Sequence, residues 1–320
     1  MRKIRWGVLS TAKCARERLV PAMIASKNSE VIAVASRDEE KAKLFAKDFD
    51  IPRTYGNYED LLKDPDIDAI YIPLPNHLHL EWTLKAAEAK KHVLCEKPAA
   101  LNAQDTQKMV ETCRKHGVLF MEAFAFRCHP DWHKLKHILD SGYIGDIKSV
   151  QAHYSIFVEN EDNIRLDPDK GGGALYDVGS YCVNAIRYIM GEEPISVYGK
   201  SRFSDKGVDL STAAILEFSN DRFGQFVCAI DSVHKQYVEI VGNKGAIRVN
   251  FSFRHPMITI QKNDKEETEI YSIQSEQYRE QVEHFCDCIL TGKSLWYDGD
   301  NAIANMKVID AIYKSAKLNR

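Results

Sequence analysis

A lysine at the end of an apolar run is the first group in the chain that suggests chemistry. Residues 93–98 read VLCEKP, so the run stops on Glu96, Lys97 and Pro98. The apolar residues predict a central strand of a parallel sheet, and Pro98 ends it because proline donates no ladder hydrogen bond. Ligands of open α/β sheets lie beyond the carboxyl ends of the strands. Lys97 is therefore a candidate to stabilise negative charge on a substrate, with Glu96 orienting it. The alternative is a surface Glu–Lys pair.

Asp177 and Tyr181 form a second candidate pair. They are four residues apart in a predicted helix, 175–190, so both project from one face of it. The carboxylate and the phenol can hold adjacent hydroxyls of a polyol. Because a free phenol titrates near pH ~10, Tyr181 needs a neighbouring positive charge, such as Lys97, to exchange a proton near neutrality. The alternative is that Tyr181 is an ordinary core residue and Asp177 an exposed helix residue.

The turn after the first predicted strand, residues 4–9, is where a dinucleotide-binding motif belongs. Where G-x-G-x-x-G has its glycines, this chain reads STAKCA at 10–15, with Gly7 upstream. Small residues roughly meet the requirement that the pyrophosphate and the helix approach the backbone closely. Gly7, Ser10, Thr11 and Ala12 are therefore candidates for nucleotide binding, although the motif itself has lost its glycines.

The end of the second predicted strand indicates which dinucleotide would bind. NAD-binding sheets usually place Asp or Glu there to hold the ribose hydroxyls, whereas this chain has Ser36 and Arg37. A guanidinium and a hydroxyl suit a 2′-phosphate. We therefore expect NADP, with NAD as the second option. The alternative is that both residues simply end the strand while Asp38 caps the next helix.

A proline-rich loop follows another buried strand. Residues 73–79 read PLPNHLH, and Pro75, Asn76 and His79 are candidates to lie beside a nicotinamide. Prolines restrict the backbone of such a loop. The alternative is a proline loop in which His79 merely begins a helix.

Composition argues against several classes of protein. The 320 residues carry a formal net charge of -3 with both signs mixed, so we expect no nucleic-acid partner. The sequence enters its first strand without a charged and apolar leader, and contains no apolar run long enough to cross a bilayer. We therefore expect a cytoplasmic protein without membrane contact, whose 8 cysteines are reduced.

Strand and helix patterns alternate over residues 1–122. The predicted strands are 4–9, 31–35, 69–72, 93–95 and 118–121, and the predicted helices are 14–25, 39–49, 59–62, 79–89 and 103–116. Such alternation predicts right-handed crossovers and a doubly wound parallel sheet. We expect residues 1–122 to form an α/β Rossmann domain that binds NAD(P).

Residues 123–320 follow another pattern. Predicted helices at 131–139, 175–190, 275–290 and 300–317 flank strand-like runs at 147–156 and from 195 to about 273. Turn signals at 205–207 and 243–245 separate some of these runs. Four residues here and just before are candidates to line a substrate cavity, and each is equally explained as structural: Arg127, His153, Phe157 and Arg165.

Histidines at a four-residue spacing superficially suggest a metal site. His129, His133 and His137 recur along one predicted helix. No cysteine or carboxylate completes a ligand set at a recognisable spacing. We therefore predict no metal site.

In their order and spacing, the stretches quoted above resemble the glucose–fructose oxidoreductase/inositol dehydrogenase (Gfo/Idh/MocA) family. Two further stretches share the resemblance, EAFAFRCHP at 122–130 and GGGALYDVGSY at 171–181. The resemblance covers nearly the whole chain. It implies a Rossmann domain followed, over 123–320, by an α+β domain with a large, open, mainly antiparallel sheet that binds substrate. It also implies a homodimer through that sheet.

The resemblance also implies a reaction. The family places an Asp and a general acid/base at the positions of Asp177 and Tyr181. Inositol dehydrogenases have His where this chain has Tyr181, so the sequence is more similar to the dihydrodiol and xylose dehydrogenase branch. We expect an NADP-dependent oxidoreductase that moves a hydride at a carbinol or carbonyl carbon of a sugar, polyol or vicinal diol. Because the sequence begins almost at its first strand, without the N-terminal arm of glucose–fructose oxidoreductase, the cofactor should exchange freely. The alternative is a non-catalytic NADP-binding regulator, which has no need of Lys97, Asp177 and Tyr181 together.

Overall fold

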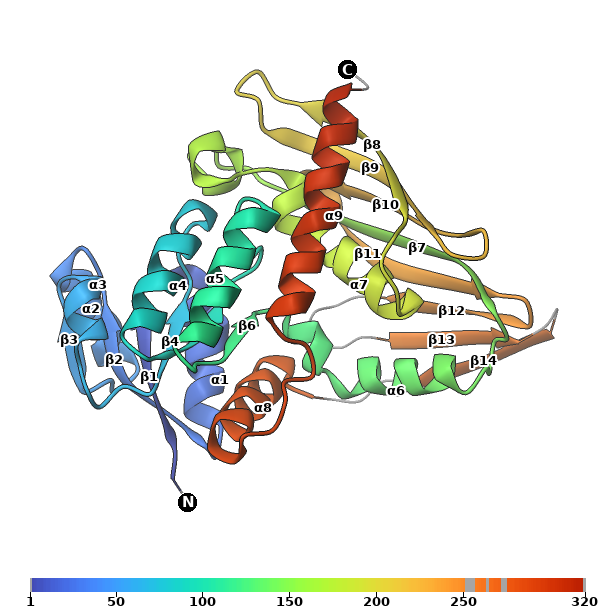
Figure 1. Ribbon diagram of the computed structural model, residues 1–320. Helices are drawn as coiled ribbons and strands as arrows, with labels where there is room; N and C mark the ends of the chain where they lie inside the picture. The colour runs from blue at the N-terminus through green and yellow to red at the C-terminus, as the bar shows by residue number, and fades with distance from the viewer. Residues whose placement is uncertain (1, 251–256, 263–264, 272–274, 319–320) are drawn as a thin grey trace. The chain divides into compact units, whose positions relative to one another are not determined.

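The computed structural model describes residues 2–250, 257–262, 265–271 and 275–318. The chain divides into two compact units (Figure 1). Unit 1 comprises Met1–Cys128 and Glu276–Ile303, and unit 2 comprises His129–Ser275 and Ala304–Arg320.

Unit 1 is built on a six-stranded sheet in the order β3-β2-β1-β4-β5-β6. Every strand pair in it is parallel, which confirms the expected Rossmann-type fold. Central strands such as β4 and β5 are short apolar runs because helices cover both faces of a parallel sheet. The elements are β1 (Ile4–Leu9), η1 (Ala15–Leu19), α1 (Val20–Ala25), β2 (Ser29–Ala35), α2 (Glu39–Asp48), β3 (Arg53–Tyr55), α3 (Tyr58–Leu62), β4 (Ala69–Ile72), η2 (Asn76–Leu78), α4 (His79–Glu88), β5 (His92–Cys95), α5 (Ala103–Lys115), β6 (Phe120–Glu122), η3 (Ala125–Cys128) and α8 (Gln277–Thr291).

Two features of unit 1 differ from the sequence-based expectation. The edge strand β3 was not predicted, because its three residues are partly polar and show no periodicity. Residues 276–303, expected in the second domain, belong to unit 1. Helix α8 packs an apolar side against β1, with the rings of Phe285 and Trp6 5.6 Å apart. A contact between residues this distant in sequence cannot be recognised from local patterns.

Unit 2 is built on an eight-stranded sheet in the order β14-β13-β12-β11-β7-β10-β9-β8. Only β7 and β10 pair in parallel, and the other described pairs are antiparallel, as expected. The elements are α6 (Pro130–Asp140), β7 (Ile147–Phe157), η4 (Ile164–Leu166), η5 (Pro168–Lys170), η6 (Leu175–Gly179), α7 (Ser180–Met190), β8 (Ser196–Phe203), β9 (Asp209–Phe218), β10 (Arg222–Ala229), β11 (Asp231–Gly242), β12 (Gly245–Asn250), β13 (Met257–Lys262), β14 (Lys265–Tyr271) and α9 (Gly299–Leu318), of which the last begins in unit 1.

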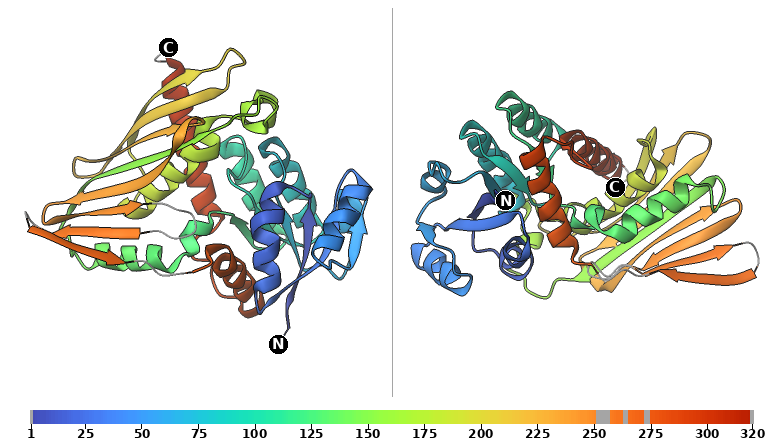
Figure 2. Two further views of the ribbon diagram at one scale, coloured as in Figure 1. Left: turned by 180° about the vertical axis from the view of Figure 1, so that it is seen from behind. Right: turned by 90° about the horizontal axis from the view of Figure 1, so that it is seen from below.

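The two faces of this sheet differ. Helices α6, α7 and the later part of α9 lie against one face, and none of the described helices of unit 2 lies on the other (Figure 2). On the helix-covered face, β7 contributes the buried Val150 and Ala152. Strand alternation turns the intervening residues toward the open face.

Two general features of the chain bear on the expectations above. Among the described residues, no helix is both long enough and apolar enough to span a bilayer. Each of the 8 cysteines is a free thiol.

Candidate active site

The turn after β1 adopts a backbone conformation that glycine normally provides. Ser10 has a φ of 125°, which side-chain-bearing residues rarely adopt. Its amide donates to the carbonyl of Ala35 over 3.0 Å and so joins the end of β1 to the end of β2. The π-helical turn η1 follows, and such turns are often found at functional sites. Ser10, Thr11 and Ala12 thus lie in a strained turn that is the candidate pyrophosphate site.

Gly7 is explained by packing. It lies inside β1, upstream of the turn, where it pairs with Ala33 and Ile70. A Cβ on Gly7 would come within 2.6 Å of Leu61 Cδ2. The ends of buried side chains thus fill the space that a larger residue would need, which gives Gly7 a packing role. We therefore assign Gly7 to packing, and its predicted part in nucleotide binding stays a prediction.

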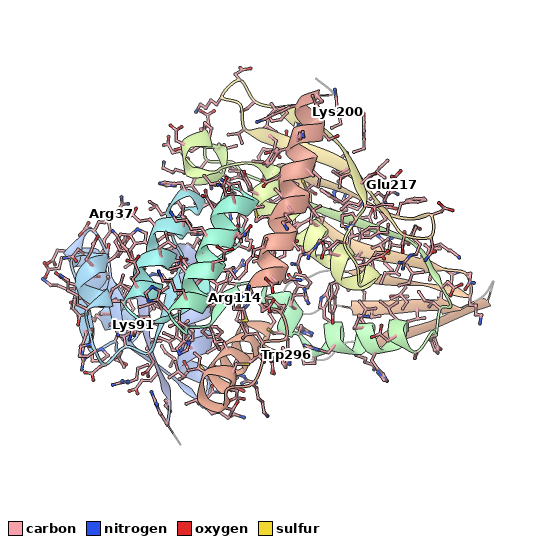
Figure 3. The ribbon with its side chains drawn as sticks, viewed as in Figure 1. Arg37, Lys91, Arg114, Lys200, Glu217 and Trp296 are labelled. Carbon is pink, nitrogen blue, oxygen red and sulfur yellow. The ribbon has the colours of Figure 1, made fainter. Side chains whose placement is uncertain are left out.

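The end of β2 places Arg37 at the same edge of the sheet as Ser10. The Arg37 side chain is exposed (Figure 3). The buried Ser36 hydroxyl accepts a hydrogen bond from the Asp38 amide over 3.2 Å. Asp38 in turn caps α2 by accepting from the Lys41 amide. The alternative considered for this segment, in which Asp38 caps the next helix, is therefore also present in the structure.

Tyr58 lies close to Ser10 and Arg37, and no motif in the sequence identified it as a candidate site residue. It is 6% exposed at the start of α3, edge-on to the ring of Trp82. Burial raises the pKa of Tyr58, and the nearby Arg37 guanidinium and Ser10 hydroxyl partly offset that rise. The Asn57 cap predicts where α3 begins, but a tyrosine at a helix start is too common to indicate a binding role.

His79 connects two loops. It is fully buried, with Nδ1 2.9 Å from the carbonyl of Pro98 and Nε2 2.8 Å from that of Leu74. Burial lowers the pKa of His79. Because both ring nitrogens face protein carbonyls, we assign His79 to positioning the loops and not to direct nucleotide contact. Pro75 and Asn76 lie partly exposed in the loop that it holds.

The loop that carries Lys97 is held by further buried groups. Glu96 accepts a hydrogen bond from the hydroxyl of the fully buried Tyr71, with 2.6 Å between the oxygens. The amide of Ala99 donates to the buried carboxylate of Glu122 over 2.8 Å. Lys97 itself is partly exposed, and the peptide bond to Pro98 is cis. The lysine therefore extends from a loop that is hydrogen-bonded on both sides of it, at the carboxyl end of β5, as its sequence predicts.

Cys14 adds a thiol to this neighbourhood. Burial, and secondarily the charge of Glu96, raise the pKa of Cys14 to about 11. The thiol therefore stays protonated near neutral pH, where a thiol is a poor nucleophile. The nearby Tyr71 hydroxyl acts in the opposite direction and lowers the pKa of Cys14.

In unit 2, Asp177 and Tyr181 lie on one continuous helix formed by η6 and α7, as predicted. The η6 segment is a π turn, which contains Asp177. Arg165 Nε donates to Asp177 Oδ2 over 2.5 Å, so one predicted cavity residue directly fixes a predicted catalytic residue. The ring of Tyr181 meets that of Tyr154 edge-on at 5.6 Å, and Tyr154 lies 6.4 Å from His234.

The other predicted cavity residues lie elsewhere. His153 alternates with Tyr154 along β7, so it faces the open side of the sheet, where it stacks on Tyr237. Phe157 follows the same alternation and is 62% exposed. Arg127 is buried in unit 1, 4.9 Å from the centre of the Tyr297 ring. The sequence places residues on β7 correctly, but the face that each side chain takes depends on the register with the neighbouring strands.

The first of the three histidines that recur at a four-residue spacing, His129, has a structural role. His129 caps α6 by accepting from the amide of Asp131 over 3.1 Å. Within the described ranges, no three His, Cys, Asp or Glu side chains gather in a way that would hold a metal ion.

Known protein families match both units. Residues 4–124 match the GFO_IDH_MocA family, described as an oxidoreductase family with an NAD-binding Rossmann fold. Residues 132–248 match the GFO/IDH/MocA C-terminal domain.

Individual relatives match along most of the chain. D-xylose 1-dehydrogenase (NADP(+)) 2 of Haloferax volcanii is 35% identical over 98% of this chain and 97% of its own length. Trans-1,2-dihydrobenzene-1,2-diol dehydrogenase of Xenopus tropicalis is 36% identical over 77% of this chain and 74% of its own length. A crystal structure of KijD10, a 3-ketoreductase from Actinomadura kijaniata in complex with NADP and TDP-benzene, is similar with a TM-score of 0.92 and 30% identity over 98% of both chains.

Proposed function

Because this chain belongs to the GFO/IDH/MocA oxidoreductase family, we propose that it transfers a hydride between NADP and a carbinol or carbonyl carbon of a sugar, cyclic polyol or vicinal diol. It is an NAD(P)-dependent dehydrogenase or reductase. The observation that carries the substrate class is the pair on one helix in unit 2, a carboxylate fixed by Arg165 and a phenol. Vicinal hydroxyls are the groups that such a pair can hold side by side.

The residues of unit 1 fit NADP. The strained turn at Ser10 presents the backbone where a pyrophosphate would lie, and Ser36 and Arg37 follow at the end of β2. Tyr58 lies near both Ser10 and Arg37, which act to lower the pKa of its phenol. We assign the 2′-phosphate to Arg37, because a guanidinium pairs well with phosphate and Ser36 and Arg37 stand where NAD-binding sheets usually place a carboxylate. Thr11, Ala12, Pro75 and Asn76 complete the proposed nucleotide-binding set.

The proton is handled by the chain's own residues. NADP, when bound, supplies or accepts the hydride. We assign to Tyr181 the proton that leaves or reaches the substrate oxygen, and to Lys97 the stabilisation of the negative charge that develops there. A cation also favours ionisation of a phenol, so one lysine serves both purposes. Glu96, held by Tyr71, orients the lysine, and Asp177 holds the neighbouring hydroxyl.

The name of a relative gives the first substrates to test. Turnover should be followed at the absorbance band of reduced nicotinamide with D-xylose, other aldoses and trans-dihydrodiols, with NADP and NAD in parallel. We expect turnover with at least one of them, and a higher affinity for NADP. The rival is a non-catalytic regulator. It would be favoured if NADP bound tightly while no member of the panel, in either direction, changed the absorbance.

The open face of the unit 2 sheet supports self-association. Five apolar side chains on it are 41% to 53% exposed: Tyr198, Ile215, Phe223, Val227 and Val241. Next to them, His153 stacks on Tyr237, with the Arg248 guanidinium 4.4 Å from the centre of the tyrosine ring. Exposed apolar patches of this kind mark interaction sites. We propose a homodimer formed through this face.

The oligomeric state can be tested by one pair of variants. Val227→Asp should convert a dimer of the wild type to monomer, as measured by the mass in solution at micromolar concentration. Leu44→Asp, which changes a 62% exposed leucine on α2, is the control and should leave the mass unchanged. A monomeric wild type would refute the proposal.

A further inference from the structure

A buried carboxylate behind the helix that carries Asp177 and Tyr181 accepts three hydrogen bonds. Asp209, the first residue of β9, is 2% exposed. It accepts from the Leu175 amide at 2.8 Å, the Thr212 hydroxyl at 3.0 Å and the Tyr313 hydroxyl at 2.7 Å. Strand β9, the helix start and α9 therefore meet at one carboxylate. An isolated buried carboxylate is costly, and three donors are what makes it tolerable.

The bond to Leu175 caps a helix. The first amides of a helix have no partner within it, and a negative charge near them is favourable. Here the acceptor comes from a distant strand instead of the preceding residue, since the local cap position, Ala174, makes no side-chain hydrogen bond. The turn that begins there is the π turn η6, a rare conformation that the surrounding structure must hold in place.

Gly173 shows that the loop is fitted to this carboxylate. It has a φ of 134°, and a Cβ there would come within 2.1 Å of Asp209 Oδ1 and 3.0 Å of the Tyr313 hydroxyl. The carbonyl of Gly173 accepts from the amide of Asp177 over 3.0 Å. The position of Asp177 is therefore linked to Asp209 through a single residue.

Helix α9 holds the same segment at a second point. The buried Asn305 donates from Nδ2 to the carbonyl of Ser180, the residue before Tyr181, over 3.4 Å. Its Oδ1 accepts from Arg187 Nη1 over 3.1 Å. Asn305 and Tyr313 thus connect α9 to the two ends of the turn between Gly173 and Tyr181.

We infer that Asp209 is a positioning residue: its carboxylate anchors the glycine-rich loop and the π turn to β9 and α9, and so keeps Asp177 and Tyr181 in one geometry. The inference rests on the proposed function in so far as those two residues act on substrate. The anchoring itself is a property of unit 2 and is measurable without any substrate.

The experiment compares Asp209→Asn and Tyr313→Phe with Ser315→Ala. Ser315 lies on the same helix as Tyr313 and accepts from the Gly199 amide over 3.0 Å, so its variant removes a comparable bond that does not reach the loop. Amide hydrogen exchange should become about ten- to a hundredfold faster at Leu175 and the following residues in Asp209→Asn, because an asparagine has one acceptor oxygen where the carboxylate has two, so that a buried donor loses its partner. Tyr313→Phe should show a smaller increase at the same amides, and Ser315→Ala none there.

Steady-state kinetics provide the second measurement. With a substrate found in the panel, kcat should fall in both loop variants while KM for NADP stays unchanged, since the nucleotide set lies in unit 1. Wild-type exchange rates at Leu175–Tyr181 in both loop variants would overturn the inference. Faster exchange together with full turnover in Tyr181→Phe would support the anchor and overturn the proposed function instead. If Asp209→Asn does not fold, Tyr313→Phe, which removes one hydroxyl, decides by the same exchange measurement.

Discussion

The two units hold their proposed reactive groups in different ways. In unit 1, Arg37 and Lys97 each lie two residues beyond the end of a parallel strand, β2 and β5 respectively. In unit 2, Asp177 and Tyr181 stand on a helix whose first turn is held by Asp209, some thirty residues later in the chain, and by α9. The helix that follows the Ser10 turn in unit 1 and the helix that carries Asp177 and Tyr181 in unit 2 both start with a π turn, η1 and η6 respectively.

The difference shows where the local sequence is enough to predict the position of a side chain. The carboxyl ends of parallel strands meet at one edge of a sheet, so a residue that follows such a strand is placed by the fold class alone. No equivalent rule applies to a helix beside an antiparallel sheet. Its position depends on polar contacts between distant segments, which must be satisfied because they are buried.

The largest expected effect is on turnover, and it tests whether Lys97 of unit 1 and Tyr181 of unit 2 act together. Lys97→Met and Tyr181→Phe should each lower turnover by roughly 10²–10⁴-fold, the usual contribution of acid–base assistance, while leaving the dissociation constant of NADP nearly unchanged. The double variant should lose far less than the product of the two, if both serve one proton transfer. Lys63→Met, which changes an exposed lysine on the same unit, is the control. A loss below tenfold in Lys97→Met would remove the lysine from the mechanism.

The preference for NADP over NAD tests the role that we assign to Arg37 at the end of β2. Arg37→Ala should weaken NADP binding by about ten- to a hundredfold and leave NAD binding almost unchanged, because only the 2′-phosphate loses its partner. Arg114→Ala is a matched control, as Arg114 lies exposed on α5 and pairs with Asp300 (Figure 3). Dissociation constants of both nucleotides decide the point, and equal losses would return Arg37 to a structural role. Raising the salt concentration should narrow the wild-type preference, since the contact is exposed.

A smaller effect tests the long-range anchor in unit 2. Burial raises the pKa of Asp209 from 3.8 to about 6. Because the folded state binds this proton more tightly, the stability that Asp209 contributes is greatest below pH 3.8 and is lost as the pH rises through 6. As the pH falls from 8 to 5, the free energy of unfolding should therefore rise by roughly 1 kcal/mol more in the wild type than in Asp209→Asn.

The groups around Asp209 do not titrate in this range. Burial raises the pKa of Tyr176, Tyr313 and Cys228 above their ordinary values, so all three stay neutral between pH 5 and pH 8. Urea unfolding of both proteins at the two pH values is the measurement. Parallel pH dependences in the two proteins would show that Asp209 does not carry the effect.

The smallest expected effect separates packing from nucleotide binding in unit 1. Gly7→Ala should lower the free energy of unfolding by about 1 kcal/mol, since the added methyl meets Leu61, while NADP affinity stays unchanged. Gly56→Ala is the control for the general effect of replacing a glycine, because a Cβ there meets nothing closer than 3.6 Å. A selective loss of NADP affinity in Gly7→Ala would restore Gly7 to the nucleotide site.

The sequence predicted a good part of unit 1 because its signals are local. Strand β4 was expected at its observed bounds, since a short run of four apolar residues predicts a buried strand of a parallel sheet. His79 was assigned to the cofactor because its neighbours in sequence suggested a loop beside the nicotinamide. Its burial between Leu74 and Pro98 follows from how two loops approach each other.

By itself, the sequence determined the fold class, the order of the elements and the residues that end the strands at the proposed nucleotide site, because alternation and chain-breaking residues act over a few positions. Only the tertiary structure decided which faces and which distant partners the side chains meet. His153 and Tyr154 are neighbours in sequence, yet only Tyr154 packs on Tyr181, since successive residues of a strand point to opposite faces. Asp209 has no local signal at all. The role that we infer for it depends on three donors that folding brings to its buried carboxylate from β9, η6 and α9.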